Sequence, residues 1–266
     1  TGQEKHQLPW TGENSYCALV RKYYPNVKFT NAGSDHHMGH AAGGFHSSGF
    51  DTAVAVVVDG CGSHKSLTLD VNNPNAIIDA YETESIYHCS SNKIEPVFKR
   101  FANNTAPRCG DNTFELDGTI TTVKAYEGVS EYLGFGYIEA GKTMGLAPYG
   151  RKDPNIPDLF YRDTGRGDKN VFIPNYPAGS LIDTERFPYL IRKNDPREWH
   201  RDPSKITSAA KNLAWKVQQE TQEFVGDLIE KAVDITGENN IVISGGYGLN
   251  CVANYYFKER FPELNI

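Results

Sequence analysis

The sequence predicts an α/β protein with a mixed sheet and flanking helices, and three observations carry this prediction. Residues 51–101 read as consecutive strands, beginning with a near-continuous β-branched run at 53–59. Residues 207–236 read as one long amphipathic helix, and a short apolar strand follows at 241–244. A chain of 266 residues, 39% hydrophobic and 23% charged, can bury the core that such a fold needs.

Two helices are predicted before the sheet. Residues 16–24 form a short helix that stops before Pro25. The histidine-rich segment that follows Asp35 forms a second helix, which we expect to fray at Gly43 and Gly44 because glycine is a poor helix former.

Four strands are predicted next. Residues 53–59 suit a strand buried on both faces, and residues 65–71 alternate between apolar and polar. Residues 84–89 and 93–98 form a hairpin around the polar turn at 90–92. We expect these strands to pair in chain order as an antiparallel meander, with strand 241–244 added in parallel through a right-handed crossover.

In the rest of the chain, secondary structure is hard to predict before residue 207 and clear after it. Residues 126–150 are dense in glycine and aromatics, residues 151–206 read as an irregular insertion, and no long helix is predicted between 102 and 206. The long helix at 207–236 ends at Gly237, which fits the position after a helix. After strand 241–244 come a glycine turn at 245–248 and a helix at 249–260.

Composition excludes several classes of protein. A net charge of −6 gives no electrostatic reason to expect nucleic acid or an anionic membrane as a partner. No apolar run approaches the roughly 20 residues of a spanning helix, and the first residues lack a signal-peptide core. The 5 cysteines are scattered, which favours reduced thiols in the cytoplasm over a disulfide framework.

A candidate metal site lies in the histidine-rich helix. His36 and His40 are four residues apart, so they share one helix face. Asp59 ends the first predicted strand and could supply a third ligand. This donor set favours iron, zinc or manganese over magnesium. The alternative is a polar helix end with ordinary histidines, but the strand-Asp-Gly context favours the metal site.

Two further segments are candidates for phosphate binding. Ser244 and the glycines Gly245, Gly246 and Gly248 join a strand to a helix, where backbone N–H groups can converge on an anion and Asn250 can add a hydrogen bond. A tight turn that only needs glycine is the alternative.

The other segment is the glycine-rich stretch at 141–150. It has Gly-Lys-Thr but lacks the earlier glycine of a P-loop, which argues against that motif. We expect a loop whose Lys142 contacts a phosphate or carbamoyl oxygen, or else a solvated lysine.

Together these segments resemble the carbamoyltransferase family, which includes the nodulation-factor and tobramycin O-carbamoyltransferases. The resemblance is carried by HHMGHA at 36–41, by the strand ending VVDG at 57–60, by the decapeptide at 141–150 and by SGGYGLNC at 244–251. A tyrosine stands at 247, where the family usually has an aliphatic residue. Order and approximate spacing also agree across most of the chain.

The resemblance implies an actin/hexokinase-like nucleotide-binding (ASKHA) fold. Residues 1–50 would be the remnant of a first subdomain, and residues 51–266 a second subdomain with an insertion near 151–206. His36, His40 and Asp59 would bind a divalent metal, with iron preferred. A further aspartate ligand, a preceding strand and a C-terminal domain that makes carbamoyl-adenylate from carbamoyl phosphate and ATP are all expected outside residues 1–266.

The activity implied is transfer of a carbamoyl group from carbamoyl-adenylate to a hydroxyl of a small-molecule acceptor, in a cytoplasmic protein that can form a homodimer. Asp59 and Lys142 are the catalytic candidates, whereas Gly60 and the residues of the 244–250 turn would bind the nucleotide. Two alternatives remain: a non-catalytic nucleotide- or metal-binding module, and another ATP-dependent enzyme of the same superfold.

Overall fold

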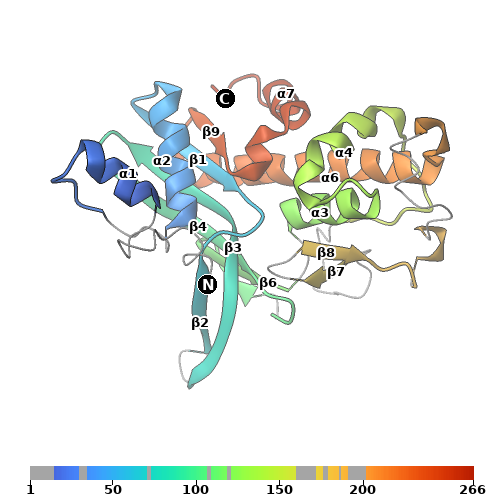
Figure 1. Ribbon diagram of the computed structural model, residues 1–266, viewed down its shortest axis with the longest axis horizontal. Coiled ribbons are helices and arrows are strands. Elements are labelled where there is room, and N and C mark those ends of the chain that lie inside the picture. Colours follow the sequence, from blue (N-terminus) through green and yellow to red (C-terminus); the bar gives the residue numbers. More distant parts are fainter. Residues whose placement is uncertain are drawn as a thin grey trace. The chain divides into compact units, whose positions relative to one another are not determined.

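The computed structural model describes residues 15–29, 35–70, 73–106, 109–118, 121–159, 172–175, 179–185, 187–190 and 202–266 (Figure 1). Its contacts divide the chain into two compact units, Thr1–Ser34 and Asp35–Ile266. In the first unit, α1 (Ser15–Tyr23) is the helix predicted at 16–24. Among the described residues, no helix has the length and apolar character needed to cross a membrane.

The second unit is built on a mixed sheet, which confirms the predicted α/β class. Its strands follow the order β5-β6-β4-β3-β1-β9, and β2 pairs with β3 beside this path. The pairs β1–β9 and β4–β6 are parallel, and the other pairs are antiparallel. The strands are β1 (Thr52–Val58), β2 (His64–Asp70), β3 (Asn73–Ser90), β4 (Lys93–Ala102), β5 (Cys109–Gly110), β6 (Phe114–Asp117) and β9 (Ile241–Ser244).

The predicted pairings of strand 65–71 with strands 53–59 and 84–89 are wrong, whereas the hairpin of 84–89 with 93–98 is confirmed. β1 pairs with residues 84–90 of β3, and β2 pairs with residues 73–81 of the same strand. The chain between β1 and β2 stays bonded to β3, because Asp59 N–H donates to Thr83 O and Gly62 N–H to Glu82 O. The glycines at 60 and 62 therefore shape an irregular stretch along the edge of β3, and the chain does not turn back on itself there.

Helices cover both faces of the sheet (Figure 1). The side chains of β1 alternate between two hydrophobic clusters, as expected for a strand buried on both sides. One cluster joins Ala53, Ala55 and Val57 to α2 (His36–Ser48). The other joins Val54, Val56 and Val58 to residues of α6 (Ser208–Thr236) and α3 (Thr122–Tyr132).

The helix α2 does not fray at its glycines, which corrects the predicted end. It continues through Gly43 and Gly44 to Ser48, where Gly49 adopts a left-handed φ of 80°. A Cβ added at Gly44 would lie 2.6 Å from Cγ1 of Val242 in β9. Glycine at this position lets the helix approach the sheet closely, and the resulting packing outweighs its low helix propensity.

The long helix and the glycine that ends it agree with the prediction. Thr207 Oγ1 accepts a hydrogen bond from Ala210 N–H, and Gly237 follows the last turn with a left-handed φ of 68°. The apolar face of this amphipathic helix is interrupted at Thr221, which is buried and accepts a hydrogen bond from the Tyr247 hydroxyl at 2.9 Å. That contact links α6 to the glycine turn after β9.

The middle of the chain contains helices that were not predicted. α3 has 11 residues, and the predicted loop at 141–150 is instead α4 (Ala140–Leu146) followed by the 3-10 helix η3 (Ala147–Tyr149). Parts of the predicted insertion lie outside the described residues. The remaining elements are β7 (Phe172–Asn175), β8 (Gly179–Ile182), η2 (Tyr137–Glu139), η5 (Pro188–Leu190), η6 (Pro203–Lys205), η7 (Gly246–Leu249) and α7 (Cys251–Arg260).

Candidate functional site

The structure brings His36, His40 and Asp59 together where α2 meets the end of β1. His36 Nε2 lies 3.0 Å from Asp59 Oδ2 and 3.1 Å from His40 Nε2. His40 Nε2 lies 3.7 Å from the same carboxylate oxygen. One ligand atom from each residue falls within 4.8 Å of the others. The helical i, i+4 spacing and the strand end thus place the three side chains as expected.

Asp59 is also held by the glycine turn that follows β9. Its second carboxylate oxygen, Oδ1, accepts a hydrogen bond from Gly246 N–H at 3.1 Å. Burial opposes ionisation of the carboxyl, but the N–H groups of Gly246 and Gly60 together with His40 outweigh it and lower the pKa of Asp59. The carboxylate is therefore charged at neutral pH, as a metal ligand must be.

His37 faces away from this cluster and into the sheet. Its ring is fully buried, and Nδ1 lies 2.8 Å from Ser85 Oγ in β3. Burial lowers the pKa of His37 to about 4, so the ring is neutral at neutral pH. A Cβ at Gly62 would lie 2.5 Å from this ring, so glycine is required there. These contacts fix the orientation of α2 and hence of His36 and His40.

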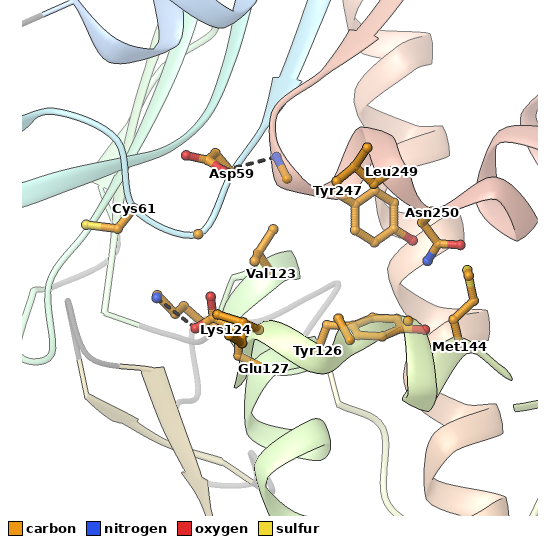
Figure 2. A pocket seen from close by; sticks show the side chains of 15 residues that line it. Asp59, Cys61, Val123, Lys124, Tyr126, Glu127, Met144, Tyr247, Leu249 and Asn250 are labelled. Atoms are coloured by element: carbon orange, nitrogen blue, oxygen red, sulfur yellow. Dashed lines mark hydrogen bonds and ion pairs between the residues drawn. The ribbon is translucent and has the colours of Figure 1, made fainter. Parts of the chain in front are cut away.

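A cavity of about 590 Å³ opens beside Asp59 (Figure 2). Asp59, Gly60 and Cys61 form one wall, and side chains of α3 form the opposite wall (Figure 2). A third wall comes from the turn after β9 and from α4. The apolar part of the lining includes Val123, Tyr126, Ile138, Met144, Tyr247 and Leu249.

A buried polar network fixes two walls of this cavity against α6. The amide oxygen of Gln218 accepts from the Tyr126 hydroxyl at 2.8 Å and from Asn250 Nδ2 at 3.1 Å. Asn250 also caps α7, because its Oδ1 accepts from Ala253 N–H at 3.0 Å. Gln218 is 1% exposed and lies outside the cavity lining, so it holds Tyr126 of α3 and Asn250 in place from behind.

Two backbone N–H groups of the predicted phosphate-binding turn donate hydrogen bonds within the protein. Gly246 N–H donates to Asp59, and Gly248 N–H donates to Gly245 O at 3.0 Å. Gly245 has a φ of 86°, and a Cβ there would lie 2.4 Å from Val58 O, so this position needs glycine structurally. Ser244 Oγ donates to His40 O at 2.9 Å.

These contacts divide the predicted site residues into two groups. Gly60, Gly246 and Asn250 line the cavity, whereas Ser244, Gly245 and Gly248 do not. Ser244 instead ties β9 to the helix that carries the histidines. The part that each of them plays in nucleotide binding stays a prediction.

Lys142 lies outside the cavity lining. Its ammonium pairs with Glu139 Oε1 at 2.5 Å, and the two side chains are 49% and 40% exposed. Its predicted contact with a phosphate or carbamoyl oxygen stays a prediction. The lysine that does line the cavity is Lys124 of α3, which sequence reasoning missed together with its partner Glu127. One sequence signal could have found this helix. Apolar residues recur every three residues at Val123, Tyr126 and Val129, a spacing that indicates a helix.

Comparison with known proteins agrees with the geometry. The family described as Carbamoyltransferase N-terminus matches residues 16–265. The uncharacterised protein sll1178 of Synechocystis sp. is 26% identical over 229 residues, which cover 83% of this chain and 31% of that protein. Nodulation protein NolNO of Sinorhizobium fredii is 24% identical over 221 residues, covering 82% of this chain and 26% of that protein. The chain thus spans less than a third of the length of these relatives.

Proposed function

The chain belongs to the carbamoyltransferase family, and on that premise we propose that it supplies the metal- and nucleotide-binding part of an O-carbamoyltransferase. The reaction is transfer of a carbamoyl group from carbamoyl-adenylate to a hydroxyl of a small-molecule acceptor. The observation that carries the proposal is the convergence of His36, His40 and Asp59 at the edge of a cavity large enough for a ligand.

We assign His36, His40 and Asp59 as ligands of a divalent metal, with iron preferred over zinc or manganese. Two imidazoles and one carboxylate suit these metals better than magnesium. With bonds of about 2.1 Å, ligand atoms of one ion lie roughly 3–4 Å apart. The three separations of 3.0, 3.1 and 3.7 Å fit that requirement. When bound, such an ion supplies Lewis-acid polarisation of a carbonyl or phosphoryl oxygen.

The cavity is the proposed place of the nucleotide. Its apolar lining from α3, α4 and the turn after β9 suits a purine ring, and Asp59 and Gly60 lie at one wall. The reactive end of carbamoyl-adenylate would lie toward Asp59, and the acceptor hydroxyl would approach from the same side. A mixed sheet with helices on both faces supports the actin/hexokinase-like fold, in which the nucleotide lies in such a cavity.

We propose that the remaining steps need sequence of the kind that the two relatives carry outside their matched regions. Formation of carbamoyl-adenylate from ATP and carbamoyl phosphate would need sequence that the two relatives have and residues 1–266 do not cover. Residues 1–266 alone, given ATP and carbamoyl phosphate, should therefore form no adenylate. The complete reading frame that contains them should carbamoylate a hydroxyl acceptor.

The test compares His36→Ala with His46→Ala, because His46 lies on the same helix, is exposed and is not part of the cluster. Metal content and affinity are measured on residues 1–266, and carbamoyl transfer on the complete reading frame. His36→Ala should lose both, and His46→Ala should retain both. Metal binding and transfer that survive in His36→Ala would exclude the assigned site. Nucleotide binding without transfer in the complete protein would favour a non-catalytic module.

A further inference from the structure

Two ion pairs with the same i, i+3 spacing lie on neighbouring helices, but only one lines the cavity. Lys124 and Glu127 of α3 are joined at 2.8 Å, and their side chains are 5% and 15% exposed. Glu139 and Lys142 face solvent outside the cavity lining. Water screens the outer pair, whereas the inner pair keeps most of its electrostatic strength.

The inner pair lies directly against the residue that follows Asp59. A Cβ built on Gly60 would lie 2.8 Å from Glu127 Oε1 and 3.6 Å from Lys124 Nζ. Figure 2 shows the two side chains joined to each other on α3, on the wall that faces Asp59 and Cys61, and Gly60 lines the same cavity. A ligand that contacts this pair is therefore also close to the Asp59 side of the cavity.

The pair has unused hydrogen-bonding capacity. A lysine ammonium has three N–H donors, and a carboxylate accepts through both oxygens. Among the described residues, Lys124 Nζ donates one hydrogen bond, to Glu127 Oε2, and Glu127 Oε1 accepts none. The wall thus presents an N–H donor and a carboxylate acceptor side by side toward the cavity.

We infer that Lys124 and Glu127 recognise the carbamoyl group of the substrate, with Lys124 Nζ donating to the carbamoyl oxygen and Glu127 Oε1 accepting from the carbamoyl NH₂. This inference rests on the proposed function and names its specificity-determining residues. An acetyl group has the oxygen but no N–H. It would cover Glu127 Oε1 without offering it a hydrogen bond, and sites of this kind discriminate strongly against such analogues.

The surroundings of the pair support recognition in a dry site. Burial raises the pKa of Glu127, although its hydrogen bond with Lys124 acts in the opposite direction. The pair is neutral as a whole, which suits a neutral amide.

The test uses residues 1–266 and four stable probes: adenosine, 2′,3′-dideoxyadenosine, and the 5′-carbamate and 5′-acetate esters of adenosine. Affinities are measured by NMR titration. The wild-type chain should bind the carbamate about ten-fold more tightly than the acetate, as expected for one hydrogen bond to a charged acceptor. Glu127→Gln should reduce this ratio to about three-fold. The double variant Lys124→Met, Glu127→Leu should bring it to about one.

The controls separate recognition from folding. Glu131→Gln changes an exposed carboxylate on the same helix outside the cavity lining, and it should keep the wild-type ratio. Lys142→Met tests the competing donor to the carbamoyl oxygen, and a lost ratio in that variant would overturn the assignment to Lys124. Because both esters bind the same folded fraction, the ratio is insensitive to partial unfolding of a variant.

Three outcomes would overturn the inference in distinguishable ways. Equal affinity of the wild-type chain for both esters removes carbamoyl recognition and leaves nucleotide binding standing. If Glu127→Gln weakens adenosine but not 2′,3′-dideoxyadenosine, the pair binds the ribose diol instead. If none of the probes binds, the nucleotide part of the proposed function fails, and this inference fails with it.

Discussion

The backbone N–H of Gly246 donates to Asp59 Oδ1 at 3.1 Å, across 187 residues of sequence. This bond joins the glycine turn after β9 to the carboxylate at the end of β1. It leaves Oδ2 of Asp59 facing His36 and His40. The candidate metal site and the wall of the cavity therefore share one side chain, and a change at Asp59 acts on both.

Asp59→Asn separates the two roles of this side chain. The amide oxygen can still accept from Gly246, so the free energy of unfolding should stay within about 1 kcal/mol of wild type. Loss of the charged ligand should weaken metal binding on the order of 100-fold. Asp59→Ala should do the same and also lower stability by about 1–3 kcal/mol, since Gly246 N–H loses its partner. Chelator competition and urea unfolding measure the two effects. Wild-type metal affinity in Asp59→Asn would rule out ligation by this residue.

Gly43 and Gly44 allow a matched test of how closely α2 packs against β9. A Cβ at Gly43 meets nothing within 4 Å, whereas one at Gly44 would lie 2.6 Å from Val242 Cγ1. Gly43→Ala should raise stability by about 0.5–1 kcal/mol through helix propensity. Gly44→Ala should lower stability by about 1–3 kcal/mol, because α2 must move off β9. Thermal unfolding of both variants checks the prediction, and equal shifts would contradict the close packing.

Gln218 tests the network behind the cavity. Gln218→Leu should leave the Tyr126 hydroxyl and the Asn250 amide without their buried partner and destabilise the fold by about 2–3 kcal/mol. Gln219→Leu, at a partly exposed position of the same helix, should change stability by less than about 0.5 kcal/mol. Urea unfolding compares the two. Similar stabilities would show that the network adds little.

The lowered pKa of Asp153, which lies outside the site, predicts that the free energy of unfolding depends on pH. Hydrogen bonds from the Tyr189 hydroxyl, Asn155 N–H and Asn212 Nδ2 lower its pKa from 3.8 to about 2. Because the folded pKa is depressed, the contribution of Asp153 to stability is present above pH 3.8 and lost as pH falls toward 2. The difference in unfolding free energy between wild type and Asp153→Asn should be constant near neutral pH and shrink over that acidic window. A difference independent of pH would contradict the depressed pKa.

The sequence predicted those elements in which local pattern and tertiary packing agree. The β-branched run of β1, the amphipathic pattern of α6 and the short apolar run of β9 are all visible in the local sequence, and β9 pairs with β1 in parallel as expected. The His36–His40 spacing fixed two candidate ligands because it depends only on helix geometry. The strand-end position of Asp59 placed the third.

The errors arise where long-range contacts decide the structure. The Gly-Cys-Gly stretch between β1 and β2 reads as a reversing turn, but the length of β3, 18 residues, lets both strands bond along one edge. The segment at 141–150 reads as a loop because of its glycines, yet it is helical against α6. Lys142 was favoured over Lys124 because a Gly-Lys-Thr motif is visible in sequence, whereas exposure to a cavity is not.

The hydrogen bonds that support the histidine cluster determine the order in which the site can form during protein synthesis. His36, His40 and Asp59 leave the ribosome before the residues that support them, within 24 residues of one another. Their supports come last: Ser244 bonds to His40 O across 204 residues, and β9 joins β1 only after α6 is complete. Pairing over such separations is slow, because loop closure precedes any gain from contact. The nascent chain thus carries all three donor groups before their supports have formed, so firm binding of the proposed metal should follow translation of β9.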